Sequence, residues 1–171
     1  MILLTARLDL VSAVPIQLRA ALAGREPLAH ALGALVPATW PPDFLDEAAL
    51  EFTLARCEED PALASWWMYF VLLRGPGARA LVGSVGFKGP PSMDGTVEVG
   101  YGIVSDQRRR GFATEATSGL VKHALAQPGV RRIIAETLPE LTASIGVLRK
   151  CGFYPAETGS EPGVLRFEFI P

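Results

Sequence analysis

The sequence contains few of the residues from which metal sites and disulfide frameworks are built. It has two cysteines, Cys57 and Cys151, and two histidines, His30 and His123, and no two of these four residues stand at the spacing of metal ligands. We therefore expect no bound metal and no disulfide framework.

Long apolar runs are also missing. No uninterrupted run approaches the roughly 20 residues that a membrane-spanning helix needs. Arg7 and Asp9 interrupt the region where a signal peptide would be apolar. We therefore expect a cytoplasmic protein with no membrane partner.

The sequence has no excess of charge of one sign. Its 16 Lys and Arg against 18 Asp and Glu leave a net charge of −2, which offers no general attraction to nucleic acid. Apolar residues make up 49% of the 171 residues, which is enough for a packed core and too many for a disordered chain. The sequence thus predicts one globular domain over residues 1–171 with no nucleic-acid partner.

Hydrophobic periodicity and turn residues define an order of elements. Alternating apolar residues predict strands, and apolar residues three or four apart predict helices. The Pro-rich segment 33–43 is expected to be an ordered loop. The expected strands are 2–10, 66–73, 80–88, 96–104, 131–137 and 163–170, and the expected helices are 15–22, 46–58, 112–126 and 142–151.

The stretch Val97 to Thr114, VEVGYGIVSDQRRRGFAT, carries the most chemical information. A strand there ends in an arginine-rich turn, and a helix opens at Gly111. A helix N-terminus has unpaired N–H groups and the positive end of the peptide dipole, so it binds phosphate without a dedicated side chain. Gly111 leaves the backbone open to a ligand. Taken alone, the pattern fits a phosphate-binding loop and a solvent-exposed polar turn equally well.

A second segment, residues 136–153, favours the ligand-binding interpretation. It places Ser144 in the first turn of a helix and Gly152-Phe153 after the helix end. Together the two segments resemble the GNAT superfamily of acyl-CoA-dependent N-acyltransferases, most of all its RimJ/RimL-type branch of ribosomal-protein N-terminal acetyltransferases. The resemblance covers residues 80–154 and is weak before residue 60. It rests on Arg108-Arg109-Arg110-Gly111-Phe112-Ala113, Thr114-Glu115-Ala116, Ala143-Ser144, Val147-Leu148, Lys150 and Gly152-Phe153.

The resemblance implies a fold and a cosubstrate. The fold is α/β (α+β), with a mixed, mostly antiparallel twisted sheet of about six to seven strands flanked by about four helices. The cosubstrate is acetyl-CoA, used without a metal. Its pyrophosphate binds the loop before helix 112–126, and its pantetheine arm occupies a slot where strand 96–104 splays from strand 131–137. The residues expected to hold it are Ile103, Arg108, Arg109, Arg110, Gly111, Phe112, Ala113, Thr114 and Ser144.

The resemblance also implies a reaction, the transfer of an acetyl group to a primary amine of a small molecule or a protein N-terminus. In the family, the amine attacks the thioester directly within a ternary complex. Glu98 is the leading candidate for the base, acting through a water, and Glu136 is the second; a structural carboxylate is an equal alternative for Glu98. Ser144 matches the serine to which protonation of the CoA thiolate is often attributed in this branch. A homodimer is common among similar proteins.

Two positions depart from the family pattern, and one aromatic residue is ambiguous. Many members have Asn where this chain has Leu141, and many outside this branch have a Tyr acid where it has Leu148. These departures keep open an alternative function, a non-catalytic acyl-CoA-binding or sensing domain. A dinucleotide-dependent oxidoreductase is disfavoured because no GxGxxG follows Val104. Trp40 lies in the loop that forms the acceptor wall in the family, so Trp40 and Glu136 are expected to contact substrate; core packing is the equal alternative for Trp40.

Overall fold

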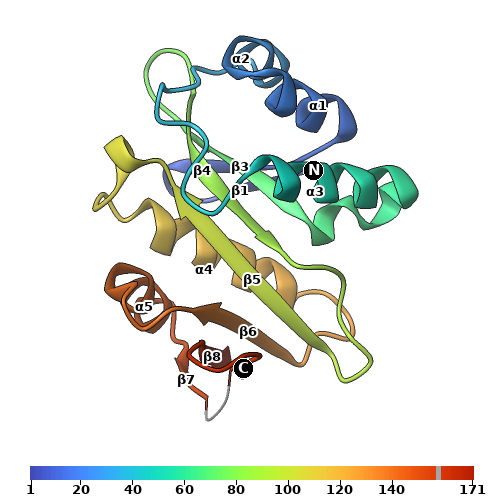
Figure 1. Ribbon diagram of the computed structural model, residues 1–171, viewed down its shortest axis with the longest axis vertical. Coiled ribbons are helices and arrows are strands. Elements are labelled where there is room, and N and C mark those ends of the chain that lie inside the picture. The colour runs from blue at the N-terminus through green and yellow to red at the C-terminus, as the bar shows by residue number, and fades with distance from the viewer. Residues whose placement is uncertain (157–158) are drawn as a thin grey trace.

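One eight-stranded sheet organises the chain (Figure 1). The computed structural model describes residues 1–156 and 159–171. The strand order is β1-β2-β3-β4-β5-β6-β8-β7, and the β5–β6 pair alone is parallel among the described pairs. The predicted mixed, mostly antiparallel sheet is confirmed. The strands are β1 Ile2–Leu4, β2 Leu8–Ser12, β3 Met68–Leu73, β4 Ala80–Phe87, β5 Thr96–Ile103, β6 Arg132–Thr137, β7 Tyr154–Pro155 and β8 Leu165–Phe169.

Sequence periodicity predicted β1 and β2 as a single strand and did not predict β7. The predicted strand 2–10 is two strands, because a turn reverses the chain between β1 and β2. Thr5 closes this turn, with its backbone N–H donating to Leu8 O at 2.9 Å and its hydroxyl oxygen accepting from the Leu8 N–H at 3.1 Å. β7 has only two residues, which is too short to show alternation.

In the part of the chain that the structure describes, five α-helices and two short 3₁₀ helices flank the sheet, one α-helix more than predicted. The additional one, α2, follows α1 after Gly24 and has no side-chain cap. Its eight residues include Pro27 and bury only Leu28 and Leu32, so its periodic signal is weak. The helices are α1 Pro15–Ala23, α2 Arg25–Leu32, α3 Glu47–Glu59, α4 Phe112–Leu125 and α5 Thr142–Lys150, with the 3₁₀ helices η1 Pro61–Trp66 and η2 Ser105–Gln107.

Alternation along the central strands divides the apolar side chains between two cores. On β3, Tyr69 and Val71 belong to the core that also contains Leu120 of α4. Their neighbours Phe70 and Leu72 belong to the second core, which α1, α2 and α3 share. Successive strand residues point to opposite faces, so α4 covers one face of the sheet and α1 to α3 cover the other (Figure 1).

β5 and β6 are paired only at their beginnings. The parallel register joins Val97 to Ile133 and stops after Glu98 and Ile134. Beyond that point β5 continues along β4 and β6 continues along β8. The two strands therefore separate toward their C-terminal ends (Figure 1), which opens the sheet at the predicted slot.

Candidate active site

The loop before α4 has the backbone conformation that a phosphate site requires. Gly111 is the N-cap residue, its φ is +81°, and no side chain caps the helix. An L side chain rarely adopts this φ. The first N–H groups of α4, on Phe112, Ala113 and Thr114, have no carbonyl of a preceding turn to bind. This cradle fits a pyrophosphate group, because unpaired donors and the helix dipole converge on one place.

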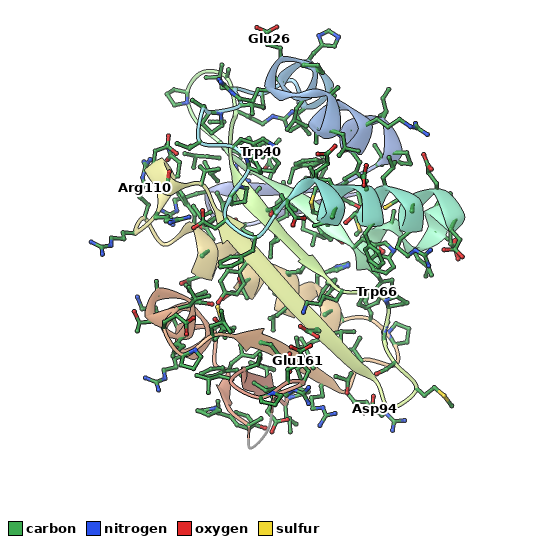
Figure 2. The ribbon with its side chains drawn as sticks, viewed as in Figure 1. Glu26, Trp40, Trp66, Asp94, Arg110 and Glu161 are labelled. Atoms are coloured by element: carbon green, nitrogen blue, oxygen red, sulfur yellow. The ribbon has the colours of Figure 1, made fainter. Side chains whose placement is uncertain are left out.

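The three predicted arginines have different surroundings. The Arg108 guanidinium donates to Ile103 O at 3.1 Å and to Asp43 Oδ2 at 2.6 Å, so it ties this loop to the segment before α3. Arg110 lies 5.1 Å from the centre of the Phe112 ring and donates to Gln107 Oε1; Figure 2 shows it at the periphery, on the loop before α4. Arg109 is exposed, with a φ of +60°. Arg108 is therefore exposed but bound to Asp43 and Ile103 O, whereas Arg109 and Arg110 lie on the rim.

A fourth arginine, Arg7, lies against the same helix terminus. It stacks 4.7 Å from the Phe112 ring centre, donates to Arg110 O at 3.1 Å, and pairs with Glu115 at 2.7 Å. Burial alone would raise the pKa of Glu115, but hydrogen bonds from Thr5 and Arg7 lower it. Arg7 thus offsets the negative charge of Glu115 in the first turn of α4. Sequence reasoning missed it because Arg7 and Glu115 are 108 positions apart and nothing local marks the contact.

A cavity of about 670 Å³ lies where β5 and β6 separate. It extends through the sheet, because its lining includes Val85 and Leu148 of the α4-side core and Trp67 and Met68 of the α3-side core. The predicted slot therefore exists and is lined by residues from both faces of the sheet. Other lining residues come from β5 (Val99, Gly100, Tyr101, Gly102), from β6 (Ala135, Glu136, Thr137), and from the start of α5, namely its N-cap residue Leu141 and Ser144.

Free backbone groups line the β5 side of this opening. Lys88 N donates to Glu98 O at 2.9 Å, and Val104 N donates to Val82 O at 3.0 Å, so the even-numbered residues of β5 direct their polar groups toward β4. In an antiparallel ladder the residues between them direct theirs the other way. Tyr101 and Ile103 therefore present their N–H groups to the slot, which fits the predicted cofactor contact at Ile103.

Ser144 and Tyr101 form a hydroxyl pair beside the slot. The Tyr101 and Ser144 hydroxyl oxygens are 2.9 Å apart, and the Tyr101 hydroxyl also donates to Ser144 O at 3.0 Å. Both side chains are half-buried and line the cavity. Burial raises the pKa of Tyr101 to about 12, although the Ser144 bond lowers it. Tyr101 is therefore a hydrogen-bond donor at neutral pH. We did not expect a role for it, because strand alternation marks Tyr101 only as an inward-facing residue.

The two candidate bases have partners within the protein. The Glu98 carboxylate forms an ion pair with Lys88, at the last β5 residue paired with β6, and it is not among the residues that line the cavity. Glu136 lines the cavity but accepts hydrogen bonds from the Ser160 N–H at 2.8 Å and from Arg166 at 2.9 Å. Burial alone would raise the pKa of Glu136, but these bonds lower it, which makes Glu136 a weak base. Neither carboxylate is free at the slot.

Trp40 is packed in the core. Its side chain is 7% exposed, its ring centre lies 5.9 Å from that of Phe70, and it is absent from the cavity lining; Figure 2 places it between the loop and the sheet. This position favours the core-packing alternative over a substrate contact. Other aromatic residues line the α3 side of the cavity instead, namely Phe44, Phe52 and Trp67.

Two classes of site find no support in the part of the chain that the structure describes. Over residues 1–156 and 159–171, no group of three or more His, Cys, Asp or Glu residues is placed to hold a metal ion. No helix within those residues has the length and apolar character needed to cross a bilayer.

Known proteins share both the sequence pattern and the fold. The family model described as an acetyltransferase (GNAT) domain matches residues 21–154. The uncharacterized N-acetyltransferase YjdG of Bacillus subtilis is 36% identical over 73 residues, which are 43% of this chain and 44% of that protein. The chain thus spans a little under half the length of this curated relative.

Solved structures extend the likeness over the whole fold. A putative ribosomal-protein-serine acetyltransferase from Vibrio cholerae superposes with a TM-score of 0.69 at 18% identity, over 100% of this chain and 98% of that one. The ribosomal L7/L12 α-N-protein acetyltransferase RimL, in complex with coenzyme A, superposes with a TM-score of 0.68 at 16% identity, over 99% and 98%. From the matching family model, supported by this fold, we conclude that the chain belongs to the GNAT acetyltransferase domain family.

Proposed function

We propose that this protein is an acetyl-CoA-dependent N-acetyltransferase that acts on a primary amine by direct attack in a ternary complex. The observation that carries the proposal is the cavity at the β5–β6 separation, which is lined by residues from both faces of the sheet. Such a passage lets a thioester on the α5 side meet an amine that enters from the α3 side. Membership of the GNAT family supports the same reaction.

The residues around the slot would hold the two halves of the cofactor. The backbone N–H groups of Phe112, Ala113 and Thr114 would bind the pyrophosphate, Gly111 would leave room for it, and the rim arginines would add screened attraction. The Ile103 N–H would bind an amide of the pantetheine arm. Acetyl-CoA, when bound, supplies the acetyl thioester that the amine attacks.

The reaction needs one proton removed from nitrogen and one delivered to sulfur as the carbon–nitrogen bond forms and the carbon–sulfur bond breaks. Glu98 would take the first proton through a water, after release or displacement of Lys88. Ser144 would donate toward the sulfur. The Tyr101 hydroxyl has a single proton, which it donates either to Ser144 O or to Ser144 Oγ. The Ser144 proton is available to the sulfur only when Tyr101 donates to Ser144 Oγ. Tyr101 is therefore a positioning residue for Ser144.

The alternative is a non-catalytic acyl-CoA-binding or sensing domain, which the apolar side chains at Leu141 and Leu148 favour. Calorimetric titration with acetyl-CoA, followed by thiol release over a panel of amines, separates the two functions. Binding with turnover supports the transferase. Binding without turnover on any amine or peptide supports the sensor, and no binding contradicts both.

The narrower predictions concern the branch and the assembly. The match at Ser144 and the two motif segments supports a RimJ/RimL-like enzyme, for which the acceptor would be a protein N-terminus. A cytoplasmic location and a homodimer remain predictions from the sequence and its resemblance. Sedimentation equilibrium of the purified chain tests the dimer, which a single monomeric species would contradict.

A further inference from the structure

Three aromatic residues form the α3 side of the cavity, and we call Phe44, Phe52 and Trp67 the aromatic wall. The rings of Phe52 and Trp67 meet edge to face, with centroids 5.7 Å apart. The Phe44 side chain is 81% exposed and that of Phe52 is 58% exposed. Large apolar side chains at the mouth of a cavity are groups that a ligand can cover.

Phe44 is held in a conformation that costs free energy. Its φ is +65°, a left-handed backbone that is rare for a bulky residue. The ring of Phe44 is exposed, so packing of that ring in the core does not explain the strain. Residues held in such conformations cluster at ligand-binding sites. The Phe44 ring is therefore held at the mouth of the cavity at a cost that a role in binding would account for.

The carboxylates around the cavity already have partners. Of the cavity-lining residues, Asp43 binds Arg108 and Glu136 binds Arg166. An acceptor with several positive charges would find no free carboxylate among these residues. Aromatic rings can also bind cations, but the Arg56 guanidinium already lies 5.7 Å from the centre of the Phe52 ring.

We infer that the acceptor is a primary amine joined by a short linker to an aromatic or similarly flat apolar group, which packs against the aromatic wall. This inference rests on the proposed function and names the substrate class of the same site. The amine reaches the thioester through the opening beside Gly100, and the apolar group stays between Phe44 and Phe52. Free arylalkylamines and peptides with an N-terminal aromatic residue share this chemistry.

The first test compares acceptors in acetyl transfer at saturating acetyl-CoA. The 2-phenylethylamine substrate is expected to exceed propylamine in kcat/KM by at least about tenfold, and spermidine by more, because an apolar group of this size discriminates by that order in an apolar pocket. A peptide with N-terminal Phe is expected to exceed the same peptide with N-terminal Ser. Preference for spermidine, or for the Ser peptide, would overturn the inference. Comparison of 2-phenylethylamine with the Phe peptide identifies the source of the amine.

The second test uses variants of the aromatic wall and measures binding directly. Phe44→Gly removes the ring and relieves the left-handed backbone, so its thermal midpoint should be no lower than that of the wild type. Phe44→Gly and Phe52→Ala are expected to weaken calorimetric binding of 2-phenylethylamine to the CoA complex by about tenfold. Glu51→Ala, an exposed neighbour on α3 outside the cavity lining, is the control.

Each failure has a different meaning. If the wall variants bind 2-phenylethylamine as the wild type does, the inference is wrong even when acetyl transfer occurs. If no amine is acetylated but 2-phenylethylamine still binds the wild type more tightly than the wall variants, the proposed function is wrong, whereas the aromatic wall is still a binding site for this class of amine.

Discussion

Substitution of Tyr101 by Phe removes one hydroxyl from the pair that we assign to Ser144 and keeps the ring in place. The lost partner atoms lie 2.9 Å away at Ser144 Oγ and 3.0 Å away at Ser144 O. A neutral hydrogen bond contributes about 1 kcal/mol, and 1.4 kcal/mol corresponds to a tenfold change in rate. We therefore expect kcat to fall about five- to tenfold. The Kd for acetyl-CoA should change little, because backbone groups bind the pyrophosphate.

Rapid-mixing measurements of thiol release give kcat, and calorimetry gives the Kd for acetyl-CoA. If Tyr101 acts through Ser144, Tyr101→Phe should cost nothing further in a Ser144→Ala background, because the group that it positions is gone. A purely structural Tyr101 would lower the thermal midpoint and leave kcat unchanged. Equal losses of kcat in both backgrounds, or no loss at all, would refute the positioning role.

Two further predictions concern the carboxylates. Glu98→Gln should lower kcat at least tenfold with little change in the Kd for acetyl-CoA, because an amide cannot accept the proton; unchanged kcat in a pH-rate profile would assign Glu98 to structure alone. Arg166→Gln should lower the thermal midpoint at pH 7 more than at an acidic pH well below 4.5, where Glu136 is protonated in the folded protein. The folded-state pKa of Glu136 lies below its ordinary value of 4.5, so its contribution to stability is present above that pH and is lost as the pH falls through the folded value. Equal losses at the two pH values, measured by calorimetry, would contradict this reasoning.

Local sequence patterns were sufficient to predict β4, β5 and the start of α4. Apolar residues along 80–88 and alternation along 96–104, with Gly and Pro between them, predicted β4 and β5 within one residue. β4 is buried at six of its eight residues, and β5 alternates over its first half. The helix start at Gly111 was readable because a glycine before an apolar helical stripe is a local signal. The separation of β5 from β6 was an expectation from the resemblance, and the register bears it out.

Contacts between distant segments could not be predicted in this way. Arg7 meets Glu115 across 108 positions, and Tyr101 meets Ser144 across 43, so no periodicity within a window reports either pair. The same limit applies to Asp43, which binds Arg108 of the loop across 65 positions. Trp40 and Phe44 lie in or beside one loop, yet the fold buries the first and exposes the second. Tertiary packing alone decides such cases.

Binding of acetyl-CoA at the α4 N-terminus is the central claim, and calorimetric titration of two matched glycine variants tests it most directly. Gly111 and Gly129 have φ values of +81° and +91°, so Gly111→Glu and Gly129→Glu impose similar backbone strain, but only the first places a carboxylate at the pyrophosphate loop. We predict that the wild type and Gly129→Glu bind acetyl-CoA alike and that Gly111→Glu binds at least about tenfold more weakly, a loss of about 1.4 kcal/mol. Absence of binding by the wild type, or equal losses in the two variants, would contradict the account.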